Sequence, residues 1–122
     1  MAVATSSSAE VFNIKTSKKH SKFFSLFSHI VTSSDLDKKQ AKPAPDIYKI
    51  CAAKFPKHPD PSSCLVIEDA PNGVQAGLAA RMQAVMIPHH KVTKEYLLPA
   101  TQVLASMEHF RPEDFGLPKC KD

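Results

Sequence analysis

The apolar run at residues 64–67, which leads directly into the adjacent carboxylates of Glu68 and Asp69, constrains the fold more than any other stretch of the sequence. Four apolar residues in a row are typical of a strand that is covered on both faces, as in a parallel sheet. Two neighbouring carboxylates at the end of such a strand repel each other and resist desolvation, so we expect a cation beside them. A divalent metal ion and a lysine are the two candidates.

Short apolar segments alternate with helical patterns along the rest of the chain. We expect strands at residues 2–4, 29–31, 84–87 and 102–104, helices at 9–19, 46–55, 72–80 and 95–98, a polar loop at 32–40 and an irregular tail at 107–122. Strands separated by helices in this way indicate βαβ units. The sequence therefore predicts a single α/β domain over residues 1–122, built on a parallel sheet.

Ligands of parallel sheets collect beyond the carboxyl ends of the strands, and that rule places Thr5, the loop before Lys42 and the acidic pair along one rim. Each group also has a simpler interpretation by itself. The hydroxyl cluster at residues 5–8 would cap a helix, Lys42 would be a solvated loop lysine, and the two acids would suit the positive end of the next helix. Taken together, they supply the hydroxyl, the cation and the metal-binding carboxylates that phosphoryl transfer requires.

The net charge of +4 and the lysines at residues 15–22 raise nucleic acid as a partner. Acidic residues are spread through the remainder and no basic run alternates with stacking aromatics, so a solvated helix end is the favoured interpretation. We therefore expect no nucleic-acid partner, and binding through the lysines stays the alternative, with a steep salt dependence as its signature. No apolar run approaches the roughly 18 residues of a membrane span, so we expect no membrane partner.

The cysteines and histidines carry no sign of a metal or disulfide framework. Cys51, Cys64 and Cys120 are widely spaced and form no Cys-x-x-Cys pair, which predicts reduced thiols and a cytoplasmic location. The adjacent His89 and His90 lack further ligands at the spacing that zinc requires, so a solvated turn is favoured there over a zinc site.

The order of these motifs resembles the haloacid-dehalogenase superfamily of phosphatases. The segments "VATS", "KPAPDIY" and "VIEDAPNGVQAGLAARM" resemble its second, third and fourth motifs, and the likeness extends over nearly all of the chain. The resemblance implies that Thr5 and Ser6 bind the transferring phosphoryl group and that Lys42 neutralises the phosphate and orients the nucleophile. It also implies that Glu68 and Asp69 hold Mg²⁺, with Asp69 as the direct ligand. The implied protein is a Mg²⁺-dependent phosphomonoesterase with a three-layer, Rossmann-like core and a phosphorylated small-molecule substrate.

The family's first motif, Asp-x-Asp-Gly, has no match in the sequence. Asp35-Leu36-Asp37 has the alternation but is expected in a polar loop without a glycine, where no rigid element would hold a nucleophile. The resemblance therefore implies that the first central strand and the cap domain are missing and that the chain alone is inactive. Exposed strand edges would then favour self-association or pairing with another chain. A non-catalytic interaction or metabolite-binding module is the alternative function.

The sequence departs from the family pattern at two further positions. Arg81 stands where the family usually has a glycine after a helix, a position suited to a left-handed backbone conformation, and we expect the arginine to cost about 1 kcal/mol there. Ala41 likewise replaces the usual glycine before Lys42. Neither substitution falls on a predicted ligand.

Overall fold

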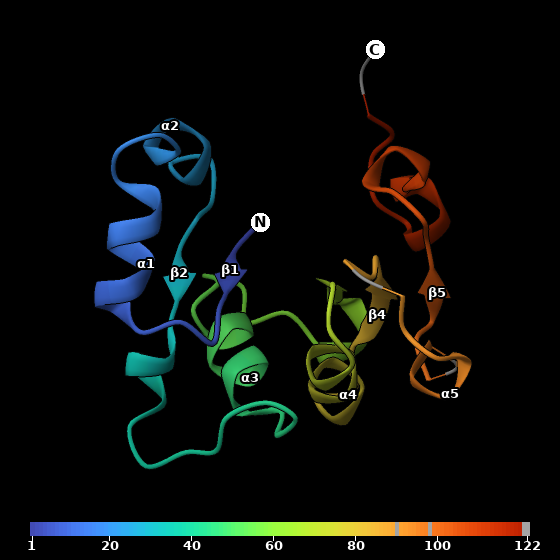
Figure 1. The fold of residues 1–122 in the computed structure, drawn as a ribbon, viewed down its shortest axis with the longest axis horizontal. Helices are drawn as coiled ribbons and strands as arrows, with labels where there is room; N and C mark the ends of the chain where they lie inside the picture. Colours follow the sequence, from blue (N-terminus) through green and yellow to red (C-terminus); the bar gives the residue numbers. More distant parts are fainter. Residues whose placement is uncertain (90, 98, 121–122) are drawn as a thin grey trace.

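The strands pair in two separate parallel sheets. The computed structural model describes residues 1–89, 91–97 and 99–120. Within these residues, one sheet pairs β1 with β2, and a second sheet has the order β3-β4-β5 (Figure 1). The strands span β1 (Val3–Ala4), β2 (Ile30–Val31), β3 (Leu65–Glu68), β4 (Gln83–Met86) and β5 (Gln102–Val103). The predicted α/β class and the parallel strands are confirmed.

The helices alternate with the strands as the sequence predicts, with differences at their ends. They span α1 (Ala9–Thr16), α2 (Ser21–Phe24), α3 (Asp46–Ala53), α4 (Pro71–Ala79) and α5 (Lys94–Leu97), with 3₁₀ turns at Ser33–Leu36, Pro61–Ser63, Met107–His109 and Pro112–Phe115. The first helix ends before the predicted residue 19, because the chain turns back and places the ring of Phe24 5.0 Å from that of Phe12. Leu98, the predicted end of the last helix, lies outside the described residues.

A single core joins the two sheets through α3 and α4. It contains Val31 from β2, Ile47 from α3, Val66 from β3, Val74 from α4 and Met86 from β4, all of which are buried. No strand pairing joins the two sheets, so this apolar packing is the main contact that brings them together. The described residues contain no helix long and apolar enough to cross a membrane.

The edges of the two sheets leave apolar surface exposed. β1 and β3 each pair with one strand neighbour among the described residues. Ile67 on β3 is 44% exposed, whereas its neighbour Val66 is buried under α4. The sequence prediction that the run 64–67 is buried on both faces is therefore wrong at Ile67, because in the described chain no element covers that side of β3.

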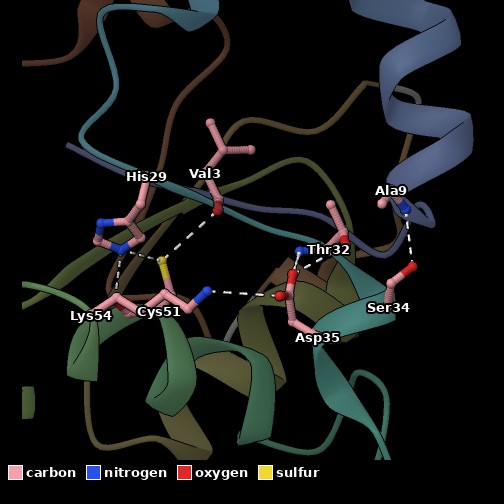
Figure 2. A network of polar contacts seen from close by, with 8 residues as sticks. All are labelled: Val3, Ala9, His29, Thr32, Ser34, Asp35, Cys51 and Lys54. Carbon is pink, nitrogen blue, oxygen red and sulfur yellow. Dashed lines mark hydrogen bonds and ion pairs between the residues drawn. The ribbon is translucent and has the colours of Figure 1, made fainter.

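A network of polar contacts fixes the segment that follows β2 (Figure 2). The Thr32 backbone N–H donates to the carboxylate of Asp35 over 2.7 Å, and Lys54 at the end of α3 lies 3.7 Å from the same carboxylate group. Ser34 accepts a hydrogen bond of 3.0 Å from the backbone of Ala9 at the start of α1. The predicted polar loop at 32–40 therefore begins with an ordered 3₁₀ turn, and Asp35 serves there as a cap.

A second set of contacts in Figure 2 ties α3 to the first sheet. His29 Nε2 lies 2.8 Å from the carbonyl oxygen of Cys51, and Cys51 Sγ lies 3.8 Å from the carbonyl oxygen of Val3. Burial raises the pKa of the Cys51 thiol. The three cysteines Cys51, Cys64 and Cys120 are free of disulfides, as the sequence predicts.

Arg81 has a left-handed backbone conformation with φ of 63°. It follows Ala80, the residue that caps the end of α4, and its N–H donates to the carbonyl oxygen of Leu78. A residue with a Cβ is strained in this conformation, while glycine is not.

We expect Arg81→Gly to raise the free energy of unfolding by about 1 kcal/mol, measured by urea denaturation. Arg81→Ala is the matched control, because it removes the same charge and side chain but keeps the Cβ, and it is expected to gain nothing. Equal effects of the two substitutions would show that the side chain, and not the backbone conformation, carries the strain.

Candidate functional site

A cavity of about 650 Å³ lies where β1 and β3 end. Every residue that the sequence singled out for phosphate or metal binding lines it, and its lining consists of Ala4, Thr5, Ser6, Lys42, Ile67, Glu68, Asp69, Ala70, Asn72, Gly73 and Ile87. These residues come from segments far apart in the chain. The carboxyl ends of the two sheets therefore converge on one hollow, where the rule for parallel sheets places a ligand.

The hydroxyl residues after β1 divide into a helix cap and a cavity wall. Ser8 caps α1, since its side chain accepts a hydrogen bond of 3.3 Å from Val11 N–H. Thr5 continues the pairing with β2 through its N–H, which donates to the carbonyl oxygen of Val31 over 2.9 Å. Its Oγ1 accepts from Ser7 N–H at 3.1 Å. The capping interpretation of this cluster thus holds for Ser8, while Thr5 and Ser6 line the cavity.

Lys42 is a buried link between the two sheets. Its side chain is 12% exposed, and its ammonium group donates to the carbonyl oxygen of Ala4 at 3.3 Å and to Oε1 of Glu68. The peptide bond that joins Lys42 to Pro43 is cis. The simpler interpretation of Lys42 as a solvated loop lysine is therefore wrong, because both of its polar partners lie at strand ends around the cavity.

Glu68 has polar partners in the protein, whereas Asp69 has none among the described residues. Oε1 of Glu68 accepts from the ammonium group of Lys42 and from the hydroxyl group of Tyr48, and the Glu68 side chain is 10% exposed. Asp69 is exposed at the cavity and has no hydrogen bond or ion pair to any residue that the structure describes. Of the two cations considered for the acidic pair, lysine is the partner of Glu68, and the carboxylate of Asp69 is left for a ligand.

Tyr48 is a hydrogen-bond donor at this site. It is 7% exposed, and the ammonium group of Lys42 lies 4.9 Å from the centre of its ring. Burial raises the pKa of Tyr48, and the negative charges of Glu68 and Asp69 raise it further. The hydroxyl group is therefore protonated at neutral pH and donates to Glu68.

The donor set fits Mg²⁺ better than zinc. The described residues contain no group of three or more His, Cys, Asp and Glu side chains that would hold a metal ion by themselves. Mg²⁺ takes only one or two carboxylates in many sites and completes its shell with water and phosphate oxygens, whereas structural zinc needs four protein ligands. Asp69 would be the direct ligand. His90, half of the His89-His90 pair, lies outside the described residues.

Sequence reasoning missed Tyr48 and Gly73. Tyr48 lies in the segment "KPAPDIY", which was assigned to the third motif, but the tyrosine itself was given no role. Gly73 lies in "EDAPNG", and a Cβ at this position would overlap with the carboxyl group of Glu68. In both cases the signal was the position of the residue inside a recognised motif. The motif does not indicate which residue each one contacts.

The chain is similar in sequence to known hydrolases and phosphatases. A family model described as haloacid dehalogenase-like hydrolase matches residues 1–81. The chain is 50% identical to a probable pseudouridine-5′-phosphatase of Drosophila melanogaster over 98% of its own length and 52% of that protein. It is 42% identical to the mitochondrial (DL)-glycerol-3-phosphatase 1 of Arabidopsis thaliana over 98% of its own length and 40% of that protein.

A solved structure supports the fold. The HAD hydrolase, family IA, variant 3 from Entamoeba histolytica superposes with a TM-score of 0.76 at 23% identity, covering 93% of this chain and 50% of that one. The chain thus spans about half the length of the relatives that it matches.

We expect Lys42→Met to lower the free energy of unfolding by about 2–3 kcal/mol, because it leaves the carboxylate of Glu68 buried without its counter-charge. Adding Glu68→Gln should recover most of that loss, since no buried charge then remains. Urea denaturation of the two single variants and the double variant measures the coupling, with the exposed Lys39→Met as the matched control. Additive losses would contradict the buried ion pair.

Proposed function

Because the chain belongs to the haloacid dehalogenase-like hydrolase family, we propose that it is the phosphate- and magnesium-binding part of a phosphomonoesterase that acts on a nucleotide-like monophosphate. The observation that carries the proposal is the convergence of Thr5, Lys42 and Asp69 on one cavity. The substrate class follows the Drosophila relative, whose name is probable pseudouridine-5′-phosphatase. Since the chain spans 52% of that relative, the activity of the longer protein is itself part of the proposal.

Each residue has a distinct part in binding the phosphate. Thr5 and Ser6 present hydroxyl groups to the phosphate oxygens, and Lys42 offsets their negative charge from the side of β1. Asp69 would hold Mg²⁺, which supplies further positive charge at the phosphate when bound. Glu68 keeps Lys42 in position and does not need to contact the metal.

In this proposal the chain binds phosphate but does not hydrolyse a phosphate ester. The sequence contains no Asp-x-Asp-Gly motif, and Asp69 is the one described aspartate that lines the cavity. Asp35 is engaged as the cap of a 3₁₀ turn, which supports its exclusion as a nucleophile. The unpaired edges of β1 and β3 support the absence of a central strand that would carry the missing group. The free thiols support a cytoplasmic location.

We expect the chain to bind inorganic phosphate in the presence of Mg²⁺, and Asp69→Asn to remove the magnesium dependence of that binding. Calorimetric titration with and without Mg²⁺ measures both, and the exposed Asp114→Asn is the matched control because Asp114 lies outside the cavity. Pseudouridine 5′-phosphate should not be hydrolysed above background by the unaltered chain. Phosphate binding that is equal with and without the metal would contradict a magnesium site.

The exposed side of β3 favours a second candidate, an interaction module that pairs through its strand edges. A strand with a free edge and an exposed apolar residue is a template for another strand. We expect the chain to self-associate in light scattering as its concentration rises, and Ile67→Lys to shift it toward the monomer. Gln75→Lys is the matched control, because it places the same charge at an exposed position on α4. A monomer at all concentrations would exclude this second function.

A further inference from the structure

We propose that Tyr48 is a positioning residue of the phosphate site, which holds Glu68 and Lys42 in the one arrangement that presents the lysine to a bound phosphate. The inference rests on the proposed function, and it adds a residue that contacts neither phosphate nor metal. Tyr48 is absent from the cavity lining, so its effect on a ligand has to pass through the residues that it touches.

Tyr48 contacts both members of the ion pair. Its hydroxyl group donates to Oε1 of Glu68, the same oxygen that accepts from Lys42. The ammonium group of Lys42 lies 4.9 Å from the centre of the Tyr48 ring, within the range of a cation–π contact. One side chain on α3 therefore fixes the carboxylate by its polar end and the lysine by its aromatic face.

Tyr48 itself is held rigidly. It is 7% exposed in the core cluster, and its neighbour Ile47 on α3 is 1% exposed. A buried aromatic side chain has little freedom to change its rotamer in a packed interior. A lysine side chain has a flexible stem of four carbons, and only its contacts fix its conformation. The rigid member of the group is thus the tyrosine.

The backbone of Gly73 also lies close against Glu68. A Cβ at this position would overlap with the carboxyl group of Glu68. Gly73 lies inside α4, where its backbone conformation suits any residue, so the requirement for glycine here is one of space. The carboxylate of Glu68 therefore contacts the hydroxyl group of Tyr48 on α3 and occupies the space beside Gly73 on α4.

Without the hydroxyl group, the carboxylate loses one of its two fixed donors, and Lys42 follows it away from the cavity. We expect Tyr48→Phe, which keeps the ring, to weaken the binding of inorganic phosphate about tenfold at saturating Mg²⁺, as expected for loss of a buried hydrogen bond to a charged group. Tyr96→Phe is the matched control, because Tyr96 is 52% exposed and lies outside the cavity, and its phosphate affinity should stay unchanged.

A merely structural role for Tyr48 would not depend on Glu68. The same substitution made in the Glu68→Gln background should therefore change phosphate affinity about twofold or less. Gly73→Ala approaches Glu68 by another route: the added Cβ should displace the carboxyl group of Glu68 and weaken phosphate binding in the same sense as Tyr48→Phe. Gly73→Ala keeps the test open if Tyr48→Phe fails to fold, which circular dichroism would reveal.

The outcomes separate the two proposals. If the unaltered chain does not bind phosphate, the proposed function fails. If the unaltered chain binds phosphate while Tyr48→Phe and Gly73→Ala bind it equally well, the phosphate site stands and the positioning role of Tyr48 is overturned. A tenfold loss that is equally large in the Glu68→Gln background would also overturn it, because the tyrosine would then not be acting through Glu68.

Discussion

The ammonium group of Lys42 is the interaction on which the site depends. It reaches the carbonyl oxygen of Ala4 at the end of β1 and the carboxylate of Glu68 at the end of β3, so it bridges two sheets that share no backbone hydrogen bond. Strand pairing does not fix the distance between Thr5 and Asp69. The apolar core brings the sheets together, and this charged contact aligns their carboxyl ends around one cavity.

The division between Glu68 and Asp69 resolves the repulsion that two adjacent carboxylates would otherwise suffer. Glu68 is the last residue of β3 and Asp69 lies in the bend that follows, so the two acids meet different surroundings. Glu68 turns inward and is neutralised by a lysine, while Asp69 faces the cavity, where a metal and a phosphate would complete its environment. In the proposed site, Lys42 would be the permanent cation and Mg²⁺ would bind together with the phosphate. This arrangement suits an anionic substrate that arrives with Mg²⁺.

The residues around the cavity were predictable because strand ends in a parallel sheet obey a simple rule. Thr5, the acidic pair and the loop before Lys42 each follow an apolar segment, and that position places them on the rim. The roles of Tyr48 and Gly73 were not predictable, because they depend on how α3 and α4 pack around Glu68. No local pattern shows which core residue presents a hydroxyl group to a carboxylate twenty positions away in the chain.

The fold class was predictable from the sequence. Which strand faces are covered by other elements was less predictable. Strand and helix types follow from the period of apolar residues, which is a local property. The exposure of Ile67 is not local, since it depends on whether any other element covers that side of β3. The early end of α1 likewise reflects the contact between Phe12 and Phe24, which forms only when the chain has turned back.

Amide NMR with Mn²⁺ in place of Mg²⁺ tests the central claim most directly, because this paramagnetic ion prefers oxygen ligands as Mg²⁺ does and broadens the signals of nearby amides. Substoichiometric Mn²⁺ with phosphate should first broaden the amides of Ser6, Asp69 and Ala70, which line the cavity. Broadening centred on exposed carboxylates elsewhere, such as Asp114, with the cavity signals unchanged, would contradict a metal and phosphate site between β1 and β3.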